Sequence, residues 1–291
     1  MFPAELEYHR PEKLSEAIRL LDERPGLTVL AGGQSLIPEL KHRRRNLRGL
    51  VDISGVRELH RIENIDDKIR LGSLVTYATL EDDETIASKQ PILREAASQI
   101  ADPLVRNRGT IGGGLCWADP LYDMPAVMHV LNSSLIVVGK GGERRIGADS
   151  FFVNPFKTAL KPDEILTEVE VPLKGKSEGY AYHKLRKGSG GYSIAGAGSY
   201  LQIGEDYKVS NCRIAITAPP SSAYRSNEAE QWLIRKTISP YTLEHAAKLA
   251  ADKLGSTDQY RASWNYTHSV LVKLIAISLK TAYLNASETE D

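Results

Sequence analysis

The sequence predicts an α+β protein in two parts: a pair of small α/β lobes, followed by a three-stranded sheet with helices. Near the N-terminus, a helical pattern over 12–24 is followed by short apolar strand patterns over 27–33 and 47–54. Beyond residue 180, three strand-like segments come together, and two helical patterns follow them. Strands grouped apart from their helices are typical of an α+β domain.

The first lobe is expected over residues 1–55. Apolar residues of 12–24 fall on one helical face, and Pro11 stands where a helix can begin. The segments LTVLAGG (27–33) and LRGLVDIS (47–54) are typical of short buried strands. A helix beside two such strands indicates a small α/β lobe.

The second lobe is expected over residues 56–175. Residues 68–82 predict a strand followed by a helix that opens at Thr76, and residues 91–101 predict an amphipathic helix. Strand patterns are expected again from Thr110 to Val171. They include a hairpin with a glycine-rich turn over 134–148 and an alternating, half-buried strand over 164–172.

A C-terminal domain is expected over residues 176–291, after a linker at 173–179 that is rich in Gly and Lys. The predicted strands cover 180–186, 193–204 and 207–219, and the predicted helices cover 244–254 and 268–284. This arrangement gives a three-stranded sheet backed by helices.

Composition excludes several classes of function. Of the 291 residues, 37 are Lys or Arg and 37 are Asp or Glu, so the formal net charge of zero indicates no nucleic-acid partner. The N-terminus lacks the apolar core of a signal peptide, and no apolar run approaches the ~18 residues of a transmembrane segment. Cys116 and Cys212 lie far apart without a CxxC pattern, and the histidines are scattered. We therefore expect a cytoplasmic protein with no metal site of its own.

Familiar nucleotide and hydrolase motifs are missing. Residues 175–177 read GKS, but Glu170 stands where a phosphate-binding P-loop needs glycine. No G-x-G-x-x-G follows the first strand, and no G-x-S-x-G occurs. The basic run at 41–45 is open to three readings: a solvated face, a protein interface or a contact to an anion.

Two glycine-rich segments remain, and they lie about 80 residues apart: LAGGQS, from Leu30 to Ser35, and TIGGG, from Thr110 to Gly114. Successive glycines allow backbone N–H groups to point at an anion without interference from side chains. Two such loops can hold the two phosphates of one pyrophosphate, with a hydroxyl donor in each from Ser35 and Thr110. Asp123 could then accept a hydrogen bond from a sugar hydroxyl. Ordinary structural turns explain the same residues equally simply.

The segments LAGGQSLIPELK and IADPLVRNRGTIGGGLCWADPLYDMPAVM resemble the FAD-binding medium subunit of the molybdenum hydroxylases, the family of xanthine dehydrogenase and aerobic carbon monoxide dehydrogenase. The opening residues, GYAYHKLRKGSGGYSIAGAG and CRIAITAPPSSAYRSNEAE are similar too, so the resemblance spans nearly the whole chain. It implies a PCMH-type (vanillyl-alcohol-oxidase-like) FAD-binding domain in two lobes and a C-terminal α/β domain.

The resemblance also implies the residues that contact FAD. They are Leu30, Ala31, Gly32, Gly33, Gln34, Ser35, Leu36, Thr110, Ile111, Gly112, Gly113, Gly114, Asp123, Leu166, Lys184 and Tyr192. Tyr192 matches a position where some members set an aromatic ring beside the isoalloxazine, although a sheet-facing tyrosine remains the alternative. No residue is expected to be catalytic or to bind a metal.

Two positions depart from the family pattern. Many members have Asn where this chain has Gly114, which removes one side-chain hydrogen bond of about 1 kcal/mol. Gln34 replaces a His that is frequent in carbon monoxide dehydrogenases, which argues weakly against that substrate. Cys116, two residues after the second glycine segment, is a candidate redox group near the flavin or a small space-filling side chain.

The function that the resemblance implies is electron transfer. Two [2Fe–2S] clusters of a small subunit would pass electrons to FAD, which would deliver them to NAD or a quinone-type acceptor, while a large molybdopterin-binding subunit oxidises the substrate. The expected assembly is (αβγ)2, with Arg106 and Arg108 contacting the iron–sulfur subunit. The alternatives are a free-standing flavin oxidase of the same fold and an assembly subunit that has lost FAD.

Overall fold

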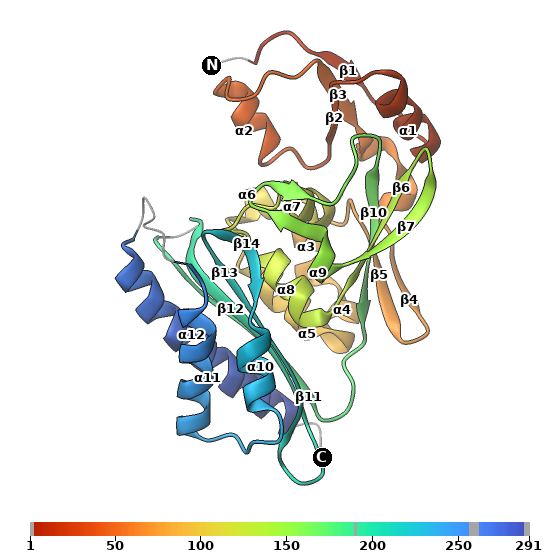
Figure 1. Ribbon diagram of the computed structural model, residues 1–291. Coiled ribbons are helices and arrows are strands. Elements are labelled where there is room, and N and C mark those ends of the chain that lie inside the picture. The colour runs from red at the N-terminus through yellow and green to blue at the C-terminus, as the bar shows by residue number, and fades with distance from the viewer. Residues whose placement is uncertain (1–2, 189–190, 256–261, 288–291) are drawn as a thin grey trace.

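The computed structural model describes residues 3–188, 191–255 and 262–287. In this part of the chain, a three-stranded, a five-stranded and a four-stranded sheet, with a short two-stranded one, are arranged in succession, and helices lie between and around them (Figure 1).

The N-terminal sheet is parallel and has the order β1-β3-β2. Its strands are β1 (Glu7–His9), β2 (Leu27–Leu30) and β3 (Gly49–Asp52). Helix α1 (Leu14–Glu23) buries Ala17 and Leu21, as the helical pattern predicts. Helix α2 (Leu36–Lys41) follows the first glycine segment, and the 3-10 helices η1 (Ile53–Gly55) and η2 (Arg57–His60) lead to the next sheet. Strand β1 was not expected, because three residues carry too little pattern.

The central sheet is antiparallel and has the order β4-β5-β10-β6-β7. Its strands are β4 (Ile62–Ile65), β5 (Lys68–Gly72), β6 (Ser134–Gly139), β7 (Gly142–Gly147) and β10 (Ile165–Pro172). The predicted hairpin over 134–148 is confirmed. Strand β10 is buried on both faces, so the expected half-buried alternation is wrong.

Helices follow β5, and the first of them begins where the sequence predicts. Helix α3 (Tyr77–Asp82) begins after Thr76, whose hydroxyl oxygen accepts from the Thr79 N–H at 3.1 Å. Such a cap satisfies an N–H group that the first helical turn leaves unpaired. The helices α4 (Glu84–Lys89), α5 (Pro91–Ser98) and α6 (Pro103–Arg106) continue toward the second glycine segment.

The expectation of strands from Thr110 onward is wrong for the next twenty residues. Helices α7 (Ile111–Trp117) and α8 (Asp123–Leu131) occupy this region. Every residue of α8 is buried, so its apolar pattern has no polar face and does not show a helical period. Helix α9 (Ala148–Phe151) and strands β8 (Phe152–Asn154) and β9 (Lys157–Thr158) complete the connection to β10.

The C-terminal sheet has four strands rather than the three expected, in the order β11-β12-β13-β14. They are β11 (Glu178–Arg186), β12 (Ser193–Ile203), β13 (Val209–Ala218) and β14 (Ser221–Arg225). Helices α10 (Asn227–Leu233), α11 (Pro240–Asp252) and α12 (Trp264–Ser287) cover its outer face (Figure 1). Strand β14 escaped prediction because it is short and directly follows two prolines.

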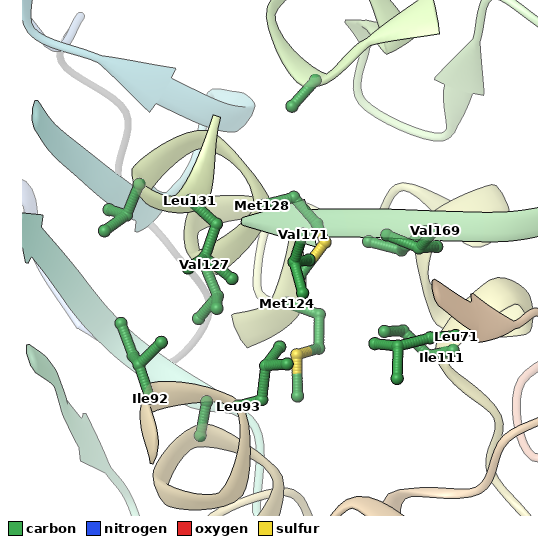
Figure 2. Packing of buried hydrophobic residues seen from close by; sticks show 14 of the residues in the cluster. Leu71, Ile92, Leu93, Ile111, Met124, Val127, Met128, Leu131, Val169 and Val171 are labelled. Atoms are coloured by element: carbon green, nitrogen blue, oxygen red, sulfur yellow. The ribbon is translucent and has the colours of Figure 1, made fainter. Parts of the chain in front are cut away.

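The inner face of this sheet packs on α8 and α5, so α8 lies between the C-terminal and central sheets. Figure 2 shows Met124, Val127, Met128 and Leu131 of α8 beside side chains of β10 and α5. Because α8 begins at Asp123, its buried body fixes the position of that carboxylate.

Helix α12 is long and apolar enough to cross a membrane by length and composition, and about a third of its apolar window is buried. One face of the helix packs on β11 and β12, while Lys273 and Lys280 lie on the exposed side. The helix therefore contributes to the core of the C-terminal domain.

Candidate functional site

A cavity of about 430 Å³ lies where both glycine segments meet the C-terminal sheet. Fifteen of the sixteen residues proposed from the resemblance line it: Leu30, Ala31, Gly32, Gly33, Gln34, Ser35, Leu36, Thr110, Gly112, Gly113, Gly114, Asp123, Leu166, Lys184 and Tyr192. The exception is Ile111, whose side chain is fully buried in the hydrophobic core. The size is within the range of cofactor pockets.

The two glycine segments touch through their backbones. A Cβ atom on Gly32 would lie 2.0 Å from the carbonyl oxygen of Arg108, two residues before the second segment. Gly33 has a φ of +74°, which side chains rarely adopt. Both positions therefore require glycine, and this contact brings two segments about 80 residues apart to one edge of the cavity.

The first segment provides a free row of backbone donors. In the part of the chain that the structure describes, the N–H groups of Gly33, Gln34 and Ser35 donate to no protein acceptor. Consecutive free N–H groups that face a cavity form an anion site.

The second segment is organised differently from the expected loop. It is the first turn of α7, and Thr110 caps this helix by accepting from the Gly113 N–H at 3.1 Å. The N–H groups of Ile111 and Gly112 donate to the carbonyl oxygens of Val75 and Ser73, both at 2.9 Å, and that of Gly114 donates to Thr110. The expectation of a second row of free backbone N–H groups is therefore wrong. The Thr110 hydroxyl keeps its proton for donation to a ligand.

Asp123 is the most heavily bonded group of the site. Its buried carboxylate accepts from Tyr182 Oη at 2.7 Å, Lys184 Nζ at 2.6 Å and Ser193 Oγ at 3.0 Å. All three donors come from the C-terminal sheet. A carboxylate has about four acceptor sites, so one remains for a sugar hydroxyl. Lys184, whose side chain is 4% exposed, is held by this ion pair at the cavity wall.

Tyr122 is a site residue that sequence reasoning missed. Its hydroxyl lies 2.6 Å from Ser35 Oγ, and its ring stacks on Tyr192 with centroids 5.9 Å apart. Tyr192 is 44% exposed at the cavity edge, so the alternative of a sheet-facing side chain is not what the structure shows. Burial raises the pKa of Tyr122, which keeps its hydroxyl protonated. The sequence signal that could have identified Tyr122 is its position directly before Asp123.

Cys116 lines the cavity, and burial raises the pKa of its thiol to about 12. The reactive form of cysteine is the thiolate, so a protonated Cys116 matches the space-filling interpretation.

The basic residues near the site divide into two groups. Arg106 donates from Nε to Glu81 at 2.7 Å and from Nη1 to the Ile100 carbonyl, and its side chain is 14% exposed. Its guanidinium therefore makes its bonds within the fold, and its contact with an iron–sulfur subunit stays a prediction. Arg108 is exposed. In the basic run, the Arg45 guanidinium lies 4.6 Å from the Trp117 ring centroid and borders the cavity.

The cavity fits a phosphate-bearing, hydroxyl-rich cofactor such as FAD. The free N–H row suits a phosphate, and the Asp123 carboxylate suits a hydroxyl. The buried Ser73 Oγ has no hydrogen-bond partner in the described residues, and Ser73 borders the cavity. That oxygen is closed off from solvent, so it is not part of the surface that the cavity offers to a ligand.

Comparisons with known proteins agree with this geometry. Residues 4–174 match the family "FAD binding domain in molybdopterin dehydrogenase", and residues 180–282 match "CO dehydrogenase flavoprotein C-terminal domain". The alpha subunit of the 6-hydroxypseudooxynicotine dehydrogenase complex of Paenarthrobacter nicotinovorans is 35% identical over 100% of this chain and 99% of its own.

Solved structures show the same likeness. Carbon monoxide dehydrogenase of Hydrogenophaga pseudoflava matches with a TM-score of 0.95 and 31% identity, over 98% of this chain and 99% of that one. Quinoline 2-oxidoreductase of Pseudomonas putida 86 matches with a TM-score of 0.93 and 29% identity, over 98% and 99%. The chain belongs to the FAD-binding medium subunits of the molybdopterin dehydrogenases, a family of oxidoreductases.

Proposed function

We propose that this subunit holds FAD in the cavity between its glycine segments and passes electrons through it within a molybdenum hydroxylase complex. The observation that carries the proposal is the backbone contact of Gly32 with Arg108, which brings both segments to one cavity. The bound flavin supplies the chemistry, because it exchanges one or two electrons.

The protein's own residues bind and orient the cofactor. The free N–H groups at 33–35 and the Thr110 hydroxyl would receive the pyrophosphate, and Asp123 would accept from a sugar hydroxyl. Tyr192, stacked on Tyr122, would lie beside the ring system. Leu166 is among the apolar residues that line the site and would contact the cofactor.

The domain division belongs to the proposal. We place the boundary at 175/176, with lobes of about 1–55 and 56–175, and this division is supported by family matches that end at 174 and restart at 180.

A cytoplasmic location is also part of the proposal. It is supported by two free cysteines, Cys116 and Cys212, which suit a reducing compartment.

The proposed partners are a small subunit with two [2Fe–2S] clusters and a large molybdopterin-binding subunit, in an (αβγ)2 assembly that reduces NAD or a quinone. Support comes from relatives named as medium chains or as a subunit of a dehydrogenase complex. The loop before the second glycine segment offers a docking point, because Leu104 is 80% exposed and Arg108 is exposed close to it.

The first experiment is the visible absorption spectrum of the purified chain, with the released cofactor identified by chromatography. Stoichiometric FAD supports the proposed site. A colourless chain that binds no added FAD would contradict it and favour the flavin-less alternative. Reduction of the isolated flavoprotein by alcohols or aldehydes without partners would instead favour the free-standing oxidase.

The docking point is tested in the assembled complex. Leu104→Ala with Arg108→Ala should leave the FAD content unchanged and slow the reduction of flavin by substrate, measured by stopped-flow absorbance. Arg19→Ala, an exposed arginine on α1, is the control. Unchanged reduction rates would remove this loop from the interface.

A further inference from the structure

Tyr77 stands where a side chain at position 114 would be. A Cβ atom on Gly114 would lie 2.1 Å from the Tyr77 hydroxyl oxygen and 3.4 Å from its Cζ. We propose that the Tyr77 hydroxyl is a hydrogen-bonding contact to FAD and replaces the side chain that Gly114 lacks. This proposal rests on the placement of FAD in the cavity described above.

The position of Tyr77 is determined by its backbone and its ring. It is the first residue of α3, and its N–H donates to the Gly109 carbonyl at 3.0 Å. Its neighbour Thr76 forms a β-bridge with Thr110. A Cβ atom on Gly109 would lie 3.1 Å from the Tyr77 ring. The ring therefore packs along the second glycine segment and carries its hydroxyl to Gly114.

The hydroxyl is available for a ligand. Tyr77 is 6% exposed, borders the cavity, and makes no side-chain hydrogen bond with the described residues. The nearest carboxylate, Asp123, is already bonded to three other side chains. Burial, with smaller contributions from Asp123 and Cys116, raises the pKa of Tyr77, so the hydroxyl keeps its proton. It is a donor without a protein acceptor.

The Tyr77 hydroxyl is open to the cavity. It is not among the fully buried side-chain atoms that lack a partner, and Tyr77 lines the cavity. An acceptor atom of a cofactor bound there would therefore receive its proton in a hydrogen bond.

The first test removes the hydroxyl and keeps the ring. In the full chain, stripped of flavin, Tyr77→Phe should weaken FAD binding about three- to tenfold, the loss expected for one hydrogen bond. Binding is measured by quenching of flavin fluorescence, and thermal unfolding of the flavin-free variant checks the fold. The control is Tyr200→Phe, since Tyr200 is buried and bonds Glu178 at 2.9 Å outside the cavity.

The second test uses the steric contact. Gly114→Ala alone places a methyl group against the Tyr77 hydroxyl and should weaken binding further than Tyr77→Phe does. In the Tyr77→Phe background the methyl group meets Cζ of residue 77 at 3.4 Å and Tyr122 Cδ2 at 3.8 Å, both ordinary contacts, so Gly114→Ala should add little. This non-additivity is the expected result of a double-mutant cycle.

The outcomes separate two failures. If the wild-type chain binds no FAD, the placement of the cofactor is wrong. If it binds FAD and Tyr77→Phe binds equally tightly, the cofactor placement stands and the Tyr77 contact is overturned. Purely additive effects of the two substitutions would also overturn it.

Discussion

At the scale of single residues, the Asp123–Lys184 pair connects the proposed cofactor site to the C-terminal domain. Both side chains are buried, with 6% and 4% exposed, and the carboxylate also accepts from Tyr182 and Ser193. A buried charge without its partner is strongly unfavourable, whereas an exposed pair contributes little. The chain contains a matched exposed pair, Asp206–Lys208, at 3.1 Å.

We expect Asp123→Asn to lower the free energy of unfolding by about 3 kcal/mol and to weaken FAD binding, because Lys184 loses its counter-charge. Asp206→Asn should change stability far less, because solvent screens an exposed pair. Urea unfolding of both variants provides the comparison. Equal stability losses would show that burial of the pair is unimportant.

At the scale of elements, a charged cluster joins three strands of the central sheet. Glu170 on β10, whose side chain is 3% exposed, accepts hydrogen bonds from Arg145 on β7 and forms an ion pair with Arg70 on β5, whose Nε lies 3.0 Å from the carboxylate. The Arg145 guanidinium, followed by the charges of Arg70 and Lys68, holds the pKa of Glu170 below its ordinary value of 4.5. The stabilisation is therefore fully present above about pH 4.5 and is lost as the pH falls through the lower folded-state pKa.

Glu170→Gln should lower the free energy of unfolding by about 1–3 kcal/mol at pH 7, the usual contribution of hydrogen bonds to charged groups. The difference from wild type should shrink as the pH falls below about 4.5. Urea unfolding at pH 7 and pH 4 measures both quantities. A difference independent of pH would show that the loss does not come from the charge.

The start of α11 shows a second element-scale device. Ser239 Oγ accepts from the Thr242 N–H at 3.2 Å, and Thr242 Oγ accepts from the Ser239 N–H at 2.8 Å, which forms a capping box. Ser239→Ala should cost about 1 kcal/mol in thermal or urea unfolding. FAD affinity should be unchanged, since α11 lies on the outer face of the sheet; a lower affinity would contradict that separation.

At the scale of the whole molecule, the cavity is a meeting point of three regions. Its lining comes from the first glycine segment, the central helices and the C-terminal sheet. A ligand that binds there should stabilise the folded chain as a unit.

At a free concentration one hundred times its dissociation constant, FAD should add about 2.7 kcal/mol to the free energy of unfolding. Differential scanning fluorimetry measures the shift in Tm. FMN, which lacks the adenylate half, is the matched control and should shift Tm less at the same concentration. Equal shifts would place the adenylate outside the cavity.

The sequence by itself determined the composition class, the longer strands, some of the helices, and the prediction that two glycine segments lie together. These features depend on local periodicity and on residue types such as Gly32, which only a close backbone contact requires. The family comparisons confirm the cofactor and the subunit type.

Tertiary structure alone decided how the site is built. The second glycine segment is a capped helix, because Thr110 and the carbonyl oxygens of Val75 and Ser73 satisfy its N–H groups. Tyr77 reaches position 114 from another helix, and Asp123 is held by a sheet that begins about fifty residues later. Contacts between residues distant in the chain leave no periodic pattern, and for that reason the sequence could not predict them.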